Sequence, residues 1–223
     1  MRFVKNENGN AAIFMLWLLG IVAIIFVITV NIIKVYVVKE QANLAVEQAA
    51  LAGTAVLLDK TREAVNEFDT RPTVDPLYIA DREVQKVTDS GKSVGDLIEE
   101  EKEKYLARGM DEGDAYIKAA NKILPPRVNG HPFLKKELKN SLGLSTSDVP
   151  YLFSSAVLET IDQNQAKTEK TEVELSREDW RVEVKSVVQY ESISDQKFIT
   201  SFLSDIPQIG YGPTLTYLEN VYN

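Results

Sequence analysis

The chain has 223 residues, enough for one modest folded domain or two small ones beside a hydrophobic segment, but not for a large multidomain enzyme. Its formal net charge of -8 argues against a protein whose affinity comes from contacts with phosphate, so we expect no nucleic-acid partner. The sequence contains no cysteine, which excludes disulfides, thiolate metal sites and a cysteine nucleophile.

An apolar segment begins close to the start of the sequence. No Asp, Glu, Lys or Arg occurs from Asn8 to Ile33, and residues 11–33 are nearly all apolar. Roughly 20 apolar residues suffice for a helix to cross a bilayer. The segment is longer than the core of a cleaved signal peptide, and no small-residue cleavage site follows it. The pattern therefore predicts an uncleaved signal anchor, with a transmembrane helix over residues 10–38.

The charges on either side of this segment predict its orientation. The short head, residues 1–9, carries Arg2 and Lys5 against Glu7, whereas the chain beyond the segment is acidic. This asymmetry favours a cytoplasmic head and an extracytoplasmic remainder, in a single-pass protein of the cell membrane. We expect three side chains to anchor the helix at the lipid headgroups, namely Lys34, Tyr36 and Lys39.

The helical pattern does not end at the predicted membrane boundary. The sequence contains no proline before Pro72, so a single helix from Asn10 to about Leu58 is expected, with residues 39–59 as its extracytoplasmic continuation. Small residues recur on this continuation at spacings of three and four, forming a narrow face made of Ala42, Ala45, Ala49, Ala52 and Gly53. Such a face allows the close approach of a partner helix. The alternative is that it packs against the chain's own domain.

The same region resembles a known family. The residues ENGNAAIF leading into the apolar segment, followed by AVEQAALAGTAV, are similar to the N-terminal region of TadE/TadG-like proteins of Tad (Flp) pilus assembly. The positions that match are Ala45, Glu47, Ala49, Ala50, Leu51, Ala52 and Gly53, while Leu44 and Gln48 depart from the family pattern. The resemblance covers residues 7–56. It implies a pseudopilin-like protein that contacts pilus or secretion-system subunits, as a homo- or hetero-oligomer, through its N-terminal helix.

The resemblance also has limits. Prepilins are cut after a glycine and usually carry glutamate at the fifth mature position, but a cut after Gly9 would place Phe14 there. We therefore expect neither processing at Gly9 nor a role as a major, polymerising pilin. Some longer family members carry an adhesion domain with an Asp-x-Ser-x-Ser metal motif. That motif is absent from this sequence.

Residues 60–147 form a predominantly polar region. A loop is predicted at 69–76, followed by helices at 94–109 and 111–124. Prolines and a glycine within PPRVNGHP, residues 125–132, predict a break or a long connecting loop. The acidic run Glu99, Glu100, Glu101 and Glu103 is expected to be a solvated helix face that pairs with Lys104 and Arg108.

Residues 148–223 mix helical and strand patterns. A helix is predicted to begin near Asp148, and alternation of apolar and charged residues predicts a two-stranded hairpin over 171–190. A further helix is predicted from about Asp195 to Pro207, and the tail after it is left open as loop, strand or short helix. The predicted fold class is α+β: a long transmembrane helix that continues outside the membrane, then a mostly helical domain with a C-terminal antiparallel hairpin or small sheet.

No pattern in the sequence predicts catalysis or cofactor binding. Gly91, Lys92 and Ser93 match the end of a phosphate loop, but Lys86 stands where the motif needs glycine, so we expect a turn. His131 is expected to be an exposed loop residue. No Asp-rich loop has calcium-ligand spacing. We therefore expect no enzyme, no catalytic residue, no cofactor and no metal.

Two functions are compatible with these features, and a third lacks the residues that it would need. The first is a membrane-anchored structural or assembly component, minor pseudopilin-like, of a Tad/Flp pilus or related secretion system, with the lipid bilayer and pilus subunits as partners. The alternative is a signal-anchored extracytoplasmic binding or sensor domain unrelated to pili. A membrane-anchored hydrolase would need a nucleophile and a base that the sequence does not display.

Overall fold

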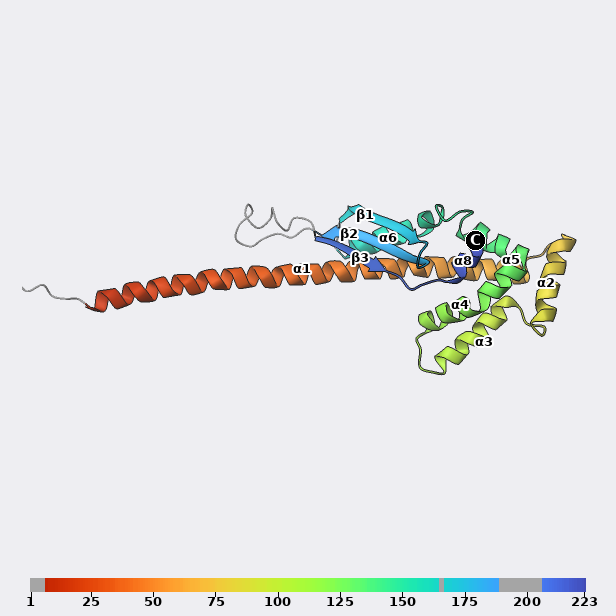
Figure 1. Ribbon diagram of the computed structural model, residues 1–223, viewed down its shortest axis with the longest axis horizontal. Helices are drawn as coiled ribbons and strands as arrows, with labels where there is room; N and C mark the ends of the chain where they lie inside the picture. Colours follow the sequence, from red (N-terminus) through yellow and green to blue (C-terminus); the bar gives the residue numbers. More distant parts are fainter. Residues whose placement is uncertain (1–6, 165–166, 189–205) are drawn as a thin grey trace, which may run out of the picture.

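A single helix dominates the molecule (Figure 1). The computed structural model describes residues 7–164, 167–188 and 206–223. Helix α1 (Glu7–Thr70) is uninterrupted. It ends twelve residues after Leu58, near which the sequence predicted its end. The extension has a physical reason, because Thr61, Ala64, Val65 and Phe68 continue a buried stripe at helical spacing.

Four helices follow α1. They are α2 (Pro76–Thr88), α3 (Val94–Leu106), α4 (Glu112–Gly130) and α5 (Pro132–Leu142). The predicted loop before α2 and the predicted helices that became α3 and α4 are confirmed, whereas α2 and α5 were not anticipated. Local caps fix three of the starts: the side chains of Asp75, Ser93 and Asp111 accept backbone N–H bonds at the beginnings of α2, α3 and α4.

The predicted break at residues 125–132 is wrong for most of its length. Helix α4 continues through Pro125 and Pro126 as far as Gly130, and only His131 separates it from α5. The flanking residues Leu124 and Val128 are both buried in the core. Packing on both sides of the proline pair therefore outweighs the loss of backbone donors.

The C-terminal part supplies the sheet. Helix α6 (Val149–Gln163) has Asp148 at its N-cap position, as predicted. Strands β1 (Lys167–Ser176), β2 (Arg181–Val188) and β3 (Ile206–Tyr211) form an antiparallel sheet in the order β1-β2-β3, and the short helix α8 (Tyr217–Tyr222) follows. The predicted hairpin is confirmed. The tail, residues 210–223, for which the sequence predicts no single structure, contains the end of β3 and helix α8.

Details of the sheet refine the prediction. Trp180 is buried as expected, but it lies in the turn between β1 and β2 with φ 49° and stacks on Tyr222 with 6.2 Å between ring centroids. The helix predicted from Asp195 falls almost entirely outside the described residues. Its expected terminator, Pro207, lies instead in β3, an edge strand, where a missing backbone donor is tolerated.

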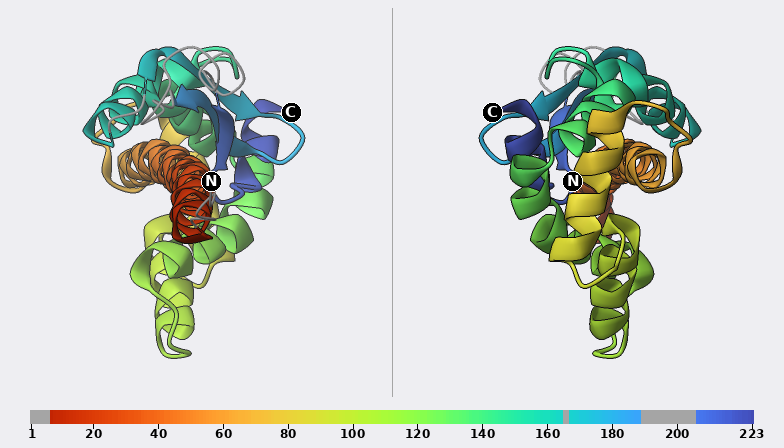
Figure 2. Two further views of the ribbon diagram at one scale, coloured as in Figure 1. Left: turned by 90° about the vertical axis from the view of Figure 1, so that its left-hand side faces the viewer. Right: turned by 90° about the vertical axis from the view of Figure 1, so that its right-hand side faces the viewer.

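All other elements are arranged around the second half of α1. The sheet and α6 lie on one side of this helix, and α3 and α4 project from the other side (Figures 1 and 2). Helix α2 lies at the end of the molecule farthest from the start of α1 (Figure 1). Buried residues from both predicted regions, 60–147 and 148–223, join α1 in one hydrophobic cluster. The fold is α+β, as predicted.

Candidate membrane and partner-binding surface

The first half of α1 is an apolar helix with no covering elements among the described residues. Large side chains such as Phe14, Trp17 and Phe26 are more than 60 % exposed. The helix is long and apolar enough to cross a membrane, and none of its most apolar 18-residue window is buried within the chain. It fits a single-pass membrane protein.

The polar groups of this segment are satisfied inside the helix. The Thr29 hydroxyl donates to the Ile25 carbonyl (2.9 Å), and Asn31 Nδ2 donates to the Val27 carbonyl (3.0 Å). Such bonds reduce the cost of placing polar side chains in lipid, where no water can replace them. The segment therefore combines an apolar surface with an internally bonded backbone.

The three predicted headgroup anchors follow the apolar segment. Tyr36 is 70 % exposed, Lys39 is exposed and Lys34 is partly exposed. Their position on α1 is the one the sequence indicated. Contact with headgroups stays a prediction.

The small-residue face of α1 is covered by the chain's own domain. Ala42, Ala45, Ala49 and Gly53 are buried, and Ala52 is partly buried. A Cβ built on Gly53 would lie 3.0–3.1 Å from side-chain carbons of Phe153, Val157 and Val182. The face therefore packs against the chain's own domain, which is the alternative that the sequence left open. Contact of the same face with a partner helix stays a prediction.

Strand β3 approaches this face more closely than any side chain would allow. A Cβ on Gly210 would lie 2.1 Å from the carbonyl oxygen of Val46, and one on Gly212 would lie 2.3 Å from Thr54 Oγ1. Gly210 in β3 and Gly212 just after it, together with alanines on the helix, therefore permit backbone-to-backbone packing. The small residues of α1 have a role in building the domain.

The opposite side of α1 carries an exposed apolar stripe, formed by Val37, Leu44 and Leu51. These side chains are 47–53 % exposed and recur every seven residues, which places them on one side of a helix. Glu40 and Glu47, both exposed, flank the stripe. Sequence reasoning missed this surface. Its spacing was visible, but which side of α1 the sheet would cover was not.

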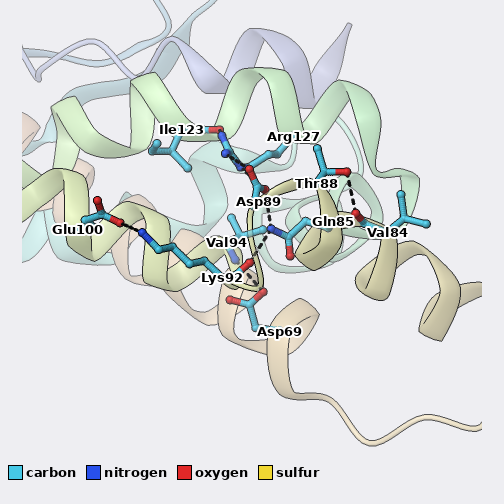
Figure 3. Close-up of polar contacts among 10 residues, drawn as sticks. All are labelled: Asp69, Val84, Gln85, Thr88, Asp89, Lys92, Val94, Glu100, Ile123 and Arg127. Carbon is cyan, nitrogen blue, oxygen red and sulfur yellow. Dashed lines mark hydrogen bonds and ion pairs between the residues drawn. The ribbon is translucent and has the colours of Figure 1, made fainter.

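A polar network joins α2 to α4 at the far end of the molecule (Figure 3). Arg127 Nε donates to Asp89 Oδ2 (3.0 Å), and Gln85 Nε2 donates to the same oxygen (2.7 Å). Burial alone would raise the pKa of Asp89, but the hydrogen bonds from Arg127 and Gln85, with the charge of Arg127, outweigh it and lower the pKa. The network fixes α2, which buries only Tyr78 and Gln85.

His131 is not the exposed loop residue that was expected. Its side chain is buried at the junction of α4 and α5, and its Nδ1 lies 2.8 Å from Asp81 Oδ1. The other oxygen of Asp81 accepts a hydrogen bond from the backbone N–H of Phe133 (3.0 Å). Because His131 makes no side-chain cap bond to α5, Asp81 of α2 performs this capping role. The arrangement connects α2 to α5.

The other residues considered for chemistry have structural partners. Gly91 lies in a turn with φ 85°, and Ser93 caps α3, so the predicted turn is confirmed. In the acidic run, Glu100 pairs with Lys104 (3.3 Å), but Glu101 is buried and pairs with Lys122 (2.6 Å), which corrects the expectation of a wholly solvated face. In the described ranges, no group of three or more His, Cys, Asp or Glu residues is placed to hold a metal ion.

Comparison with known families bears on α1 alone. Residues 9–56 match the Tad family model, described as "Putative Flp pilus-assembly TadE/G-like". The resemblance drawn from residues 7–56 is therefore confirmed for the apolar segment and the small-residue face. No curated protein and no solved structure matches the chain.

Proposed function

We propose that this chain is a membrane-anchored structural or assembly component, minor pseudopilin-like, of a Tad/Flp-type pilus or a related secretion system. The proposal rests on the two different surroundings of the halves of α1. One unbroken helix is apolar and exposed in its first half and forms the core of the folded domain in its second half. The family match over residues 9–56 supports an assembly role. A non-enzymatic role stays part of this proposal.

Deletion of the gene tests this role directly. We expect loss or shortening of surface filaments, scored by electron microscopy, and loss of adhesion. Restoration by the wild-type chain controls for effects on neighbouring genes. Normal piliation together with normal adhesion in the deletion strain would contradict the proposal.

The proposed orientation places the head of the chain in the cytoplasm and the folded domain outside. The basic residues of the head and the acidic remainder favour it. Because the chain has no cysteine, a single introduced cysteine can report its side of the membrane. A membrane-impermeant maleimide should label Glu63→Cys in intact cells, but Asn6→Cys only after permeabilisation. The reverse pattern would refute the orientation.

The exposed stripe of α1 is the proposed contact surface for partner subunits. It begins at the predicted membrane boundary with Val37 and continues beyond it with Leu44 and Leu51, and its side chains are about half exposed although they are apolar. The flanking Glu40 and Glu47 favour a partner helix that carries basic residues beside its apolar face. Burying one leucine in such a contact contributes about 1.5–3 kcal/mol.

Substitutions in the stripe test this surface. Leu44→Asp or Leu51→Asp should lower co-purification of pilus subunits from detergent extracts by about tenfold or more. Neither should unfold the domain, since both side chains face away from the core. Leu144→Asp is a matched control, because Leu144 is 73 % exposed and lies outside α1. Unchanged recovery of subunits with both stripe variants would exclude this surface as the contact.

One observation favours the alternative, a signal-anchored binding or sensor domain unrelated to pili. A cleft of about 420 Å³ lies between α1 and α3, on the folded domain. The two functions differ in what they require of the anchor. Fusion of residues 39–223 to a foreign transmembrane helix replaces residues 9–38, the first part of the family-matched segment, and should abolish an assembly function that depends on the native anchor. Full function of this chimera would favour the binding or sensor domain.

A further inference from the structure

The cleft between α1 and α3 has an apolar wall. Val65, Ile98 and the ring of Tyr116 line it, and each of these side chains is less than 5 % exposed. The guanidinium of Arg62 stacks over the Tyr116 ring, 4.0 Å from its centroid, and pairs with Asp59 (2.9 Å). Arg62 is the only basic residue among those lining the cleft, and it is already engaged.

A carboxylate without a side-chain cation stands beside this wall. Asp69, near the end of α1, accepts hydrogen bonds from the backbone N–H groups of Gly95 (2.8 Å) and Val94 (3.2 Å), at the start of α3. Figure 3 shows Asp69 beside Val94. In the described ranges, no lysine or arginine side chain forms an ion pair with Asp69. A helix N-terminus supplies roughly half a positive charge, which leaves about half of the carboxylate charge unbalanced.

Two further features keep this charge unbalanced. Asp96, also at the cleft, adds a second negative charge, and burial of Asp69 raises its pKa despite the two backbone bonds and a hydrogen bond from the Ser93 side chain. A Cβ on Gly95 would lie 3.0 Å from Asp69 Oδ2, so glycine at this position allows the carboxylate to sit against the α3 backbone. Asp69 is contacted by two backbone donors and by the hydroxyl of Ser93. Because an ionised carboxylate has lone pairs for about four bonds, one further donor can still bind.

We propose that this cleft binds a primary ammonium group carried on an aliphatic chain, with the chain against Val65 and Ile98 and the ammonium at Asp69. A lysine side chain of a partner protein and a free polyamine share this chemistry. Either would bring a positive charge to Asp69, and the apolar wall would cover the methylene groups. The cleft volume is sufficient for either one.

A titration of the full-length chain in detergent micelles tests the proposal. The readout is the NMR shift of the Gly95 and Val94 amides. Nα-acetyl-lysine methylamide should give a saturable shift, and its neutral isostere Nα-acetyl-norleucine methylamide should bind at least tenfold more weakly. Spermidine identifies the source: tighter binding than the lysine derivative points to a free polyamine, and weaker binding points to a protein side chain. Equal shifts with the lysine and norleucine derivatives would overturn the proposal.

Two variants separate charge recognition from folding. Asp69→Asn removes the charge but keeps an oxygen acceptor for α3, and should reduce binding at least tenfold. Asn66→Lys adds an ammonium three residues before Asp69, so it should occupy the cleft from within and abolish binding, while Asn66→Gln should bind as wild type. If Asp69→Asn disturbs α3, the Asn66 pair decides. Wild-type binding by Asn66→Lys would also overturn the proposal.

Discussion

Replacing Gly210 by alanine tests the closest approach between β3 and α1. The new methyl carbon would lie 2.1 Å from the carbonyl oxygen of Val46, 2.2 Å from its carbonyl carbon and 2.6 Å from the nitrogen of Glu47. All three atoms belong to the backbone of a helix, and they cannot rotate away as the end of a flexible side chain could. The strand itself must therefore move.

The size of the effect follows from this geometry. Ordinary contact requires about 3.4 Å, so β3 must move away from α1 by more than 1 Å. This shift loosens the packing of β3 on α1 and strains its pairing with β2. Overpacking of this kind costs about 3 kcal/mol, which for a domain of this size lowers the melting temperature by about 6–12 °C.

The assay is thermal unfolding of the full chain in detergent, followed by near-UV circular dichroism of the tryptophan and tyrosine side chains. Gly130→Ala is the control, since a Cβ there meets nothing within 4 Å and alanine favours the last turn of α4. We expect the control to melt at or slightly above the wild-type temperature. A Gly210→Ala protein that melts within about 2 °C of wild type would refute the close packing of β3 on α1.

Four further substitutions probe polar groups that are buried or partly buried. Asp89→Asn leaves Arg127 without its carboxylate and should cost about 2–3 kcal/mol in urea unfolding. Because the pKa of Asp89 is lowered in the fold, its contribution should be lost as pH falls below about 4. Thr61→Val removes the partner of the buried Tyr217 hydroxyl (2.8 Å) and should cost about 1–3 kcal/mol, most of it recovered by adding Tyr217→Phe. Burial raises the pKa of Tyr116 to about 12. Above about pH 10 the unfolded chain therefore loses this proton before the folded chain does, and the free energy of unfolding falls. Tyr116→Phe should make the free energy of unfolding fall less steeply with pH, by about 1.4 kcal/mol per pH unit. If the variants had the same free energy of unfolding as the wild type at every pH, the burial of these groups would be contradicted.

The elements with strong local patterns were predictable from the sequence. An unbroken apolar and alanine-rich pattern indicates α1, and alternation of apolar and charged residues indicates the β1–β2 hairpin. Helix α2 was harder to predict because it is short and buries only Tyr78 and Gln85, while apolar side chains such as Leu77 and Val87 are exposed. Asp81 and Asp89 join it to His131 and Arg127. The helix through Pro125 contradicts a local rule because packing across the proline pair prevails.

The candidate surface was only half predictable, for a similar reason. Residues 11–33 are apolar whatever surrounds them, so their sequence alone indicates lipid contact. The small-residue face does not by itself indicate its partner, because close approach by β3 and close approach by a helix of another protein require the same alanines and glycines. Which face of α1 remains free, with Leu44 and Leu51, depends on a sheet whose strands lie more than a hundred residues later.

The unbroken course of α1 has a mechanical consequence for the whole chain. Residues 39–70 extend the helix about 50 Å beyond the predicted membrane boundary, and the domain is packed against this part of the helix. A tilt of about 20° in the bilayer would therefore move α2 sideways by roughly 17 Å. Neighbouring subunits that change the tilt of the anchor would sweep the outer end of the domain across a distance larger than a helix diameter.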